Sequence, residues 1–339
     1  MRPTKQLDIK INGGLLYSVH RIIEGEYFIN FSNDTIACAN SIKNMLQAMR
    51  DEPMLGYAVP ATSNITNLQC PIINYKTFDE MYKYAKENNE YNPLRHEQRA
   101  RLCDPIGGLR SYNSLFIIGH AGHYFTNKMA FPDDVGSMLT RRAGYKNILV
   151  KDAFCHHFGS ITVKNEIDNN TYIEGRKEFM KHFGFDPWGK GFCWDYELFS
   201  NLNITAQNNA KILGISPGIG SNPLKIKTLL REHGSDGIQL YIASEEEQFR
   251  VDYESYTDAQ KVQIVEPTDF KNVFVGEKFN YIIVEISTSP TDVDSYKKRL
   301  LSGGTLIVWS SDLGVAKRLF QKSSKKIIQS GTGAWIVFR

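Results

Sequence analysis

One acidic residue stands where a carboxylate could hold a metal ion. Asp34 closes an apolar run over residues 27–31 and is followed by Thr35. A carboxylate at the C-terminal tip of a parallel strand lies where α/β sheets gather ligands. One hard oxygen ligand there can hold Mg²⁺ or Mn²⁺ against a diphosphate, with water and phosphate completing the shell. The same residues would also turn the chain and cap the next helix, and taken alone they favour that structural use.

A second acidic site is the pair Asp133 and Asp134, which follows Pro132 in the first turn of a predicted helix. The helix macrodipole favours ionised carboxylates at that position. An ionised carboxylate is suited to act as a general base that deprotonates an acceptor hydroxyl. Acidic residues are also common in first turns for structural reasons, and the pair alone favours that interpretation.

Two histidines, His156 and His157, follow a predicted strand over Asn147–Val150. Neutral imidazole is a common metal ligand, but adjacent side chains of an extended chain point to opposite faces, so only one of them could face a site. His120 and His123 have the spacing of metal ligands but no helix to present them. A histidine after a strand is more often packed than functional.

A Gly-rich turn connects the predicted strand that begins at Ile212 to a predicted helix. Ser216, Gly218 and Gly220 alternate along this turn. Such a geometry places backbone N–H groups near a ligand at a helix N-terminus, and these three residues are the candidate cofactor-binding residues. A single Gly-x-Gly turn is weak evidence, but this one lies within a βαβ pattern.

The elements that must position these residues change in character around residues 200–210. After this point short β-branched runs alternate with amphipathic segments, which is the pattern of βαβ units around a parallel sheet. Residues 201–209 form the predicted linker. The predicted strands are Lys211–Ile215, Gln239–Ala243, Val262–Val265, Tyr281–Ile286, Thr305–Trp309 and Ala334–Phe338, and the predicted helices are Pro223–His233 and Ser295–Leu301, the latter ended by Ser302-Gly303-Gly304.

The part of the chain before residue 200 has a mixed pattern. The predicted strands are Glu26–Phe31, Leu55–Val59 and Asn147–Val150, and the predicted helices are Asn40–Arg50, Phe78–Lys86 and a segment from Pro132 to Gly144.

Length and composition limit the classes of protein. The 339 residues predict two domains, and the 40 basic and 37 acidic residues nearly balance, which argues against a nucleic-acid partner. The five cysteines are scattered without a CxxC pair, as is typical of free thiols in a reducing compartment. No apolar run is long enough for a membrane span or a signal peptide. We therefore expect a cytoplasmic protein.

Residues 1–200 resemble inverting family-2 glycosyltransferases with the GT-A fold. The blocks that carry this resemblance occur in the family's order. They are Asn12-Gly13-Gly14, the strand and turn 25–35, the strand 54–60, Phe131-Pro132-Asp133-Asp134 with 141–145, and the strand-plus-histidine block 152–160. By this resemblance Asp34 would carry Mn²⁺ or Mg²⁺, Asp133 or Asp134 would be the base, and His156 or His157 would help hold the diphosphate or the metal. A nucleotide-sugar donor and a glycan or lipid-linked acceptor are the implied partners.

The beginning of the chain departs from that family. In the family a βαβαβ half of roughly 70–90 residues precedes the Asn-Gly-Gly block and binds the nucleotide base. Here only eleven residues precede Asn12. The chain is then either a fragment of a longer enzyme or a protein that has lost its donor-base pocket.

Residues 206–339 resemble the Rossmann-like fold of S-adenosylmethionine-dependent methyltransferases. The matching segments are 212–220, 240–243, Thr268-Asp269-Phe270, 279–284 and 300–308. The family's acidic residue on the first strand is replaced by Gly214, and its first glycine by Ser216. These departures place S-adenosylmethionine binding in doubt. Glu245, after the second strand, could still reach a ribose, but it begins the run Glu245-Glu246-Glu247, and this run favours a solvated charge cluster.

Together these patterns predict an α/β chain. A partial, N-terminally truncated GT-A domain would span residues 1–200, and a Rossmann-like methyltransferase-fold domain would span 206–339. The favoured function is inverting, metal-assisted transfer of a sugar from a nucleotide-diphosphate donor to a bacterial surface polysaccharide or lipid-linked acceptor, with peripheral contact to the membrane that carries such an acceptor. One alternative is a methyltransferase with a glycan-binding front domain, and another is a non-catalytic scaffold in glycan assembly.

Overall fold

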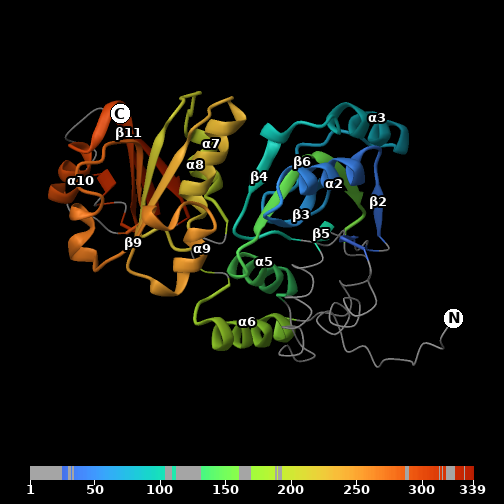
Figure 1. The fold of residues 1–339 in the computed structure, drawn as a ribbon, viewed down its shortest axis with the longest axis horizontal. Helices are drawn as coiled ribbons and strands as arrows, with labels where there is room; N and C mark the ends of the chain where they lie inside the picture. The colour runs from blue at the N-terminus through green and yellow to red at the C-terminus, as the bar shows by residue number, and fades with distance from the viewer. Residues whose placement is uncertain are drawn as a thin grey trace. The chain divides into compact units, whose positions relative to one another are not determined.

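The computed structural model divides the chain into two units. The first spans Met1–Gly189 and the second Lys190–Arg339 (Figure 1). The structure describes residues 25–29, 32, 34–103, 109–111, 131–159, 169–187, 189, 193–286, 290–312, 314, 316–317, 325–331 and 333–339. The Asn12-Gly13-Gly14 block, His120 and His123 lie outside the described residues. The domain boundaries predicted at residues 200 and 206 stay predictions.

The first unit is built on a mixed sheet in the order β1-β5-β3-β6-β2. Strand β6 pairs in parallel with β3 along one edge, and antiparallel with both β2 and β4 along the other. Its described strands are β1 (Tyr27–Ile29), β2 (Thr35–Ala37), β3 (Leu55–Thr62), β4 (His96–Gln98), β5 (Leu109–Ser111) and β6 (Lys146–His157). The sheet therefore depends on β6, which carries three neighbours along its length.

Helices cover both faces of the first sheet. Helix α2 buries Met45 and Ala48 against Ala58 of β3. Helix α5 lies on the opposite face, where a side chain at Gly56 would come within 2.9 Å of Thr140. The described helices of this unit are α2 (Ser41–Asp51), α3 (Phe78–Asn88), the short 3-10 helix η1 (Pro93–Arg95), α5 (Pro132–Arg142) and α6 (Asn169–Phe183). The predicted helices and the strands predicted at 55–59 and 147–150 are confirmed, with β6 running seven residues further than predicted. Of the strand predicted over 26–31, the segment Tyr27–Ile29 is confirmed, and residues 30 and 31 lie outside the described residues.

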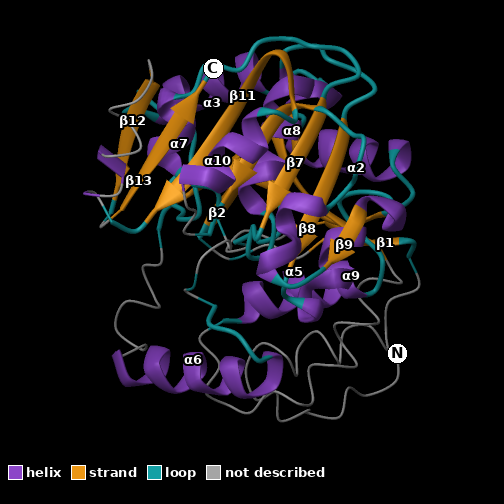
Figure 2. Ribbon diagram, turned by 90° about the vertical axis from the view of Figure 1, so that its left-hand side faces the viewer, coloured by secondary structure: helices purple, strands orange, loops and turns teal. Residues whose placement is uncertain are grey.

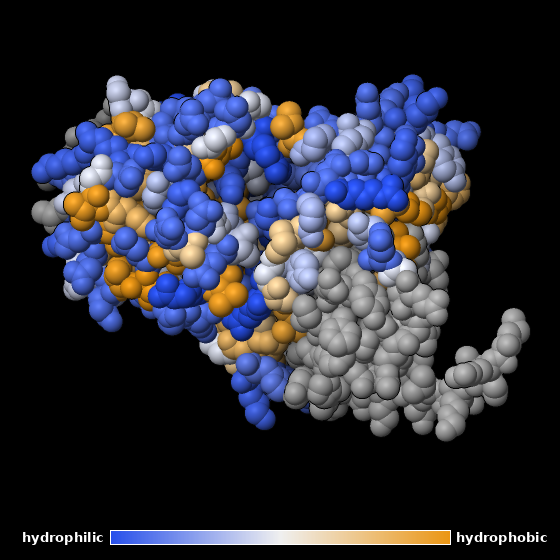
Figure 3. Space-filling model, in the orientation of Figure 1, coloured by the Kyte–Doolittle hydropathy of each residue, from blue (hydrophilic) through white to orange (hydrophobic). Residues whose placement is uncertain are grey.

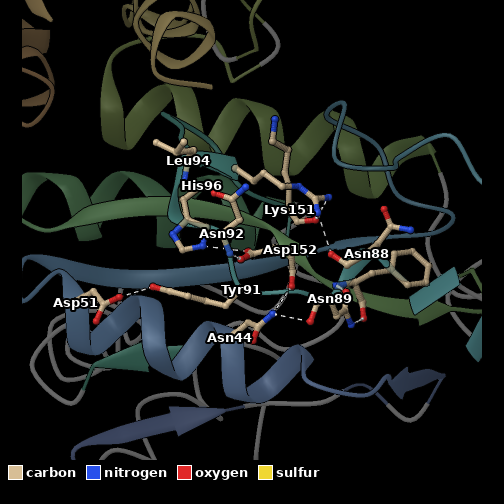
Figure 4. A network of polar contacts seen from close by, with 12 residues as sticks. Asn44, Asp51, Asn88, Asn89, Tyr91, Asn92, Leu94, His96, Lys151 and Asp152 are labelled. Carbon is tan, nitrogen blue, oxygen red and sulfur yellow. Dashed lines mark hydrogen bonds and ion pairs between the residues drawn. The ribbon is translucent and has the colours of Figure 1, made fainter. Parts of the chain in front are cut away.

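A buried polar network fastens the segment before β4 to β6 (Figure 4). Asp152 of β6 is fully buried, and its two carboxylate oxygens accept hydrogen bonds from His96 Nε2 at 3.0 Å and from the Asn92 backbone N–H at 2.5 Å. Its backbone carbonyl accepts from Asn44 Nδ2 of α2. At the edge of the network, the exposed Asp51 accepts a hydrogen bond from the Tyr91 hydroxyl. Asp152 thus ties β4, α2 and the loop before η1 to one strand.

We predict that Asp152→Ala destabilises the first unit by about 1–3 kcal/mol for each donor left without an acceptor, because buried N–H groups lose their hydrogen bonds without regaining water. Amide hydrogen exchange of peptides that cover residues 89–98 and 146–157 measures this. Asp51→Ala is the matched control, since its contact is exposed to solvent, and exchange in that variant should stay at the wild-type rate. Equal exchange in wild type and Asp152→Ala would contradict the role given to the network.

The second unit contains a sheet in the order β12-β13-β11-β10-β7-β8-β9, drawn side by side in Figure 2. The five strands from β9 to β11 in this order are parallel, and β13 runs antiparallel to both β11 and β12. The strands are β7 (Lys211–Ile215), β8 (Gln239–Ser244), β9 (Val262–Ile264), β10 (Phe279–Val284), β11 (Leu300–Ser310), β12 (Lys325–Ser330) and β13 (Gly333–Phe338). This is a Rossmann-like α/β sheet with a reversed strand near one edge.

Helices lie on both faces of this sheet. Alternate residues of each strand point to opposite faces and pack against different helices. Leu213 and Ile215 pack into one core cluster with Phe270 and Tyr296. Gly214, between them, faces the other side, toward α8. The described helices are α7 (Tyr196–Asn201), α8 (Ser221–Glu232), α9 (Arg250–Glu254), α10 (Pro290–Lys297) and the 3-10 helices η4 (Glu247–Phe249), η5 (Ala259–Lys261) and η6 (Pro267–Asn272).

The prediction for the second unit holds for the parallel strands and for α8 but is wrong near residue 300. The helix expected over Ser295–Leu301 ends at Lys297, and β11 begins at Leu300. Gly303 and Gly304 lie inside the strand instead of stopping a helix. A side chain at Gly304 would come within 3.0 Å of the Phe279 carbonyl oxygen, at the point where the pairing of β10 and β11 shifts register. The strand β12 was not predicted.

The surface of the described residues is mostly hydrophilic on the face drawn in Figure 3, with apolar side chains between the polar ones. In the described parts of the chain, no helix has both the length and the apolar character needed to cross a bilayer.

Candidate functional site

The turn between β7 and α8 is a left-handed backbone path at the carboxyl edge of the second sheet. The backbone φ angles of Ser216, Gly218 and Gly220 are +48°, +52° and +92°. Glycine adopts such angles without strain, whereas Ser216 carries a side chain and is still held in this glycine-like conformation. Gly220 is the N-cap of α8 and supplies no side chain to cap the first turn. The turn therefore presents backbone N–H groups at a helix N-terminus.

A buried tyrosine of α9 holds this turn in place. The Tyr253 hydroxyl oxygen lies 2.5 Å from the Gly218 carbonyl oxygen and 3.0 Å from Ser244 Oγ. Burial raises the pKa of Tyr253, so the phenol stays protonated and donates to the Gly218 carbonyl. The ring of Tyr256 leaves little space beside Gly220, because a side chain there would come within 3.2 Å of it. Two tyrosines thus fix the path of the turn.

Two carboxylates flank the turn, one from each strand that neighbours β7. Glu245, just after β8, accepts a hydrogen bond from Ser216 Oγ at 2.8 Å. Glu285, just after β10, donates its backbone N–H to the Ile215 carbonyl, and its Oε2 accepts from Asn222 Nδ2 at 2.8 Å. Glu245 is exposed and Glu285 is half-buried. The strand order β8-β7-β10 therefore brings an acidic side chain to each side of Ser216.

The absence of an acidic residue on β7 has a steric cause. A side chain at Gly214 would lie 2.9 Å from Cγ and 3.2 Å from Cβ of Pro223 in the first turn of α8. Helix α8 thus fills the space that a carboxylate on β7 would need. Glu285 lies one strand away and was missed in the sequence, because the strand predicted there ran to Ile286. The signal was available: Glu285 is the first charged residue after an apolar run over 281–284.

A cavity of about 290 Å³ lies on the face of the second sheet that η6 and α10 cover. Thr268 and Phe270 of η6, Ile286 after β10, and Asp292 and Tyr296 of α10 line it. Ile286 directly follows Glu285, so the cavity begins beside the flanked turn. The Thr268-Asp269-Phe270 segment that carried the methyltransferase resemblance contributes to its wall.

The residues predicted to hold a metal in the first unit come together only in part. His157 Nε2 lies 3.2 Å from Asp34 Oδ2, and its Nδ1 lies 3.2 Å from the Asn64 carbonyl oxygen. His156 points away from this pair, and its Nδ1 lies 2.6 Å from the Tyr75 hydroxyl oxygen. The alternation of a strand therefore separates the two histidines, as the sequence predicted.

The expectation of Mn²⁺ or Mg²⁺ is wrong for the part of the chain that the structure describes. No group of three or more His, Cys, Asp or Glu side chains there is placed to hold a metal ion. Asp34 is instead occupied with His157, which is buried. Both ring nitrogens of His157 face hydrogen-bond acceptors, so the pair is a structural contact between β2 and β6.

Asp134 lies in a buried ion pair. Its two carboxylate oxygens face Arg101 Nε at 2.5 Å and Arg101 Nη2 at 3.3 Å, and the residue is 2% exposed. Burial raises the pKa of the Asp134 carboxyl, while the Arg101 guanidinium acts in the opposite direction. Asp133 is half-buried beside it. The role of either residue as a general base stays a prediction.

No protein-family model matches the chain, and no curated protein matches it significantly. The glycosyltransferase resemblance of the first part therefore stays a prediction.

Solved structures similar to the chain include methyltransferases. The precorrin-6y C5,15-methyltransferase from Geobacter metallireducens is 12% identical over 40% of this chain and 80% of its own, with a TM-score of 0.31. Two S-adenosylmethionine-dependent methyltransferases in complex with S-adenosyl-L-homocysteine, from Thiobacillus denitrificans and Geobacter sulfurreducens, are 16% and 13% identical. They cover 33% and 34% of this chain and 46% and 45% of their own, with TM-scores of 0.26 and 0.25. These two neighbours hold S-adenosyl-L-homocysteine, but TM-scores of this size carry no argument about the cofactor of this chain, and the fold assignment rests on the strand order.

The contact between Gly214 and Pro223 gives a testable prediction. Gly214→Ala should destabilise the second unit by about 1–3 kcal/mol, because the added methyl group overpacks the interface between β7 and α8. The midpoint of urea unfolding, followed by the fluorescence of Trp309 and Trp335, measures the change. In a Pro223→Ala background the same substitution should cost clearly less. Strictly additive effects of the two substitutions would show that Pro223 is not the obstacle.

Proposed function

We propose that the second unit binds S-adenosylmethionine at the carboxyl edge of its sheet and that the chain is an S-adenosylmethionine-dependent methyltransferase. One observation carries this proposal: Glu245 and Glu285 stand on the two sides of the left-handed turn that joins β7 to α8. Ligands of doubly wound sheets bind outside the carboxyl ends of the strands. The proposal accords with the resemblance of residues 206–339 and replaces the sugar transfer that the sequence favoured.

The charges at the turn fit a cationic nucleoside. S-adenosylmethionine carries an ammonium and a sulfonium group, and opposite charges within a few ångströms are favourable in a partly buried site. Glu245 and Glu285 supply negative charge on both sides of Ser216. Glu246 follows Glu245 and adds to the negative potential on that side. A nucleoside diphosphate would instead meet repulsion from the same carboxylates.

The individual residues suit separate parts of the cofactor. Glu245, exposed at the end of β8, would accept hydrogen bonds from the two ribose hydroxyls. The backbone N–H groups of the turn would receive the carboxylate of the methionine part, as helix N-termini receive anions. Glu285 would hold the ammonium group, taking the place of the carboxylate for which Pro223 leaves no space beside Gly214. The cavity beside Ile286 would take the adenine ring against Phe270 and Tyr296, with the charged Lys271 and Asp292 also in its wall.

The chemistry follows from these placements. When bound, the cofactor supplies an electrophilic methyl group for a nucleophilic acceptor. The turn and its two carboxylates bind and orient it, and Tyr253 keeps the turn in position through the Gly218 carbonyl. Because Tyr253 is buried and stays protonated, it acts on the position of the backbone and takes no proton.

Isothermal titration calorimetry with S-adenosylmethionine and S-adenosyl-L-homocysteine tests the proposal. We expect Glu245→Gln and Glu285→Gln each to raise the Kd by about tenfold, because each removes a charged hydrogen-bond acceptor from the site. Glu247→Gln is the matched control: this residue belongs to the same acidic run but is paired with Arg250 at the surface, and its Kd should equal that of the wild type.

Two results would overturn the proposal. One is the absence of heat on titration of the wild-type protein with either ligand at millimolar concentration. The other is an equal Kd in the wild type and in both site variants, which would place any binding elsewhere.

A further inference from the structure

A second cavity lies in the first unit and is lined by residues that the proposed function does not use. It has a volume of about 380 Å³, at the small end of the range for ligand pockets. Its walls come from the segment before α3, from α3 itself and from the end of β6. The apolar and aromatic lining residues are Ile73, Tyr75, Phe78, Met81, His156 and Phe158. We call it the His156 cavity.

Two phenylalanines at the His156 cavity are unusually exposed for their size. Phe78 is 56% exposed and Phe158 42% exposed. Their ring centroids are 6.4 Å apart with planes at 68°, and the Phe158 ring packs edge-on against the imidazole of His156 at 4.6 Å. Scattered exposed apolar residues are normal on a protein surface, but here two of them converge on one concave site. A flat apolar ligand would remove both rings from water.

The imidazole of His156 offers one hydrogen-bond donor to the cavity. The Ser63 hydroxyl donates to the His157 carbonyl, so it has no second proton for His156. We assign the Tyr75 hydroxyl, which lies 2.6 Å from His156 Nδ1, as the donor to that nitrogen. Burial and the neighbouring His157 lower the pKa of His156, which favours the neutral ring. With this assignment the ring proton is placed on Nε2, which has no hydrogen-bond partner among the described residues.

The mouth of the cavity carries a positive charge. Lys76 lines the cavity, is exposed, and forms no ion pair with any residue that the structure describes. The nearby carboxylate of Glu80 is already used, because it accepts the backbone N–H groups of Lys76 and Thr77 in the capping box of α3. The site therefore combines aromatic walls, one neutral donor and one exposed cation.

We propose that the His156 cavity binds a small aromatic carboxylate, with the ring packed against Phe78 and Phe158, and the carboxylate on His156 Nε2 and the Lys76 ammonium. A single acceptor group matches the two donors available. A monosaccharide fits less well, because each buried hydroxyl needs its own partner and the walls are mainly carbon. The proposal stands on the first unit alone and is independent of cofactor binding by the second.

Ligand-observed NMR titration of the full chain with indole-3-carboxylate tests the proposal, with indole and methyl α-glucoside titrated in parallel. We expect indole-3-carboxylate to bind more tightly than indole, and methyl α-glucoside not to bind. Phe158→Ala should weaken indole-3-carboxylate binding at least tenfold through loss of one aromatic wall. Lys76→Met should reduce the preference for indole-3-carboxylate over indole, and His156→Phe, which keeps a flat ring, should do the same.

Tyr82→Ala is the matched control, since Tyr82 is an aromatic residue of α3 that is 49% exposed and does not line the cavity. Its affinity for indole-3-carboxylate should equal that of the wild type. The proposal is overturned if indole-3-carboxylate does not bind, if Phe158→Ala leaves its affinity unchanged, or if methyl α-glucoside binds in its place. A thermal unfolding curve of each variant separates loss of the site from loss of the fold.

Discussion

Two backbone hydrogen bonds tie the end of β7 to the strands on both sides, and the candidate site depends on them. The Ser216 N–H donates to the Ala243 carbonyl of β8, and the Ile215 carbonyl accepts from the Glu285 N–H after β10. These bonds fix the register of the three strands, and so determine which residues lie side by side at their carboxyl ends. A shift of one residue in this pairing would turn every side chain of β7 to the other face. Gly214 would then no longer meet α8, and Glu245 and Glu285 would no longer flank one turn.

The close approach of α8 to β7 explains the left-handed backbone of the turn and the glycine at position 214. Pro223 occupies the space beside Gly214, so the helix begins close above the strand. The three left-handed residues make the sharp reversal that this approach requires. An acidic side chain on β7 and Pro223 in the first turn of α8 exclude one another sterically. The acidic side chains that flank the turn come from the neighbouring strands instead, as Glu245 and Glu285.

The sequence predicted the elements of the second unit better than the contacts between them. The strand Lys211–Ile215 was predicted with its observed bounds, because short apolar runs between turn residues have one simple solution in a parallel sheet. The strand β12, the position of Gly303-Gly304 and the role of Glu285 were missed. Each depends on which strands become neighbours, and that information lies in contacts between residues far apart in the chain.

The dipeptide His156-His157 shows that residue type alone does not determine the role of a residue. Both residues were candidates for a metal site with Asp34, and the two-residue period of a strand was enough to predict that they face apart. It could not predict that β2 would pair with the end of β6 and bring Asp34 to His157, nor that the loop before α3 would bring Tyr75 to His156. The same residue type therefore serves as a buried strand-to-strand contact at one position. At the other position, His156, it lines an aromatic cavity, and the surroundings of each ring decide the difference.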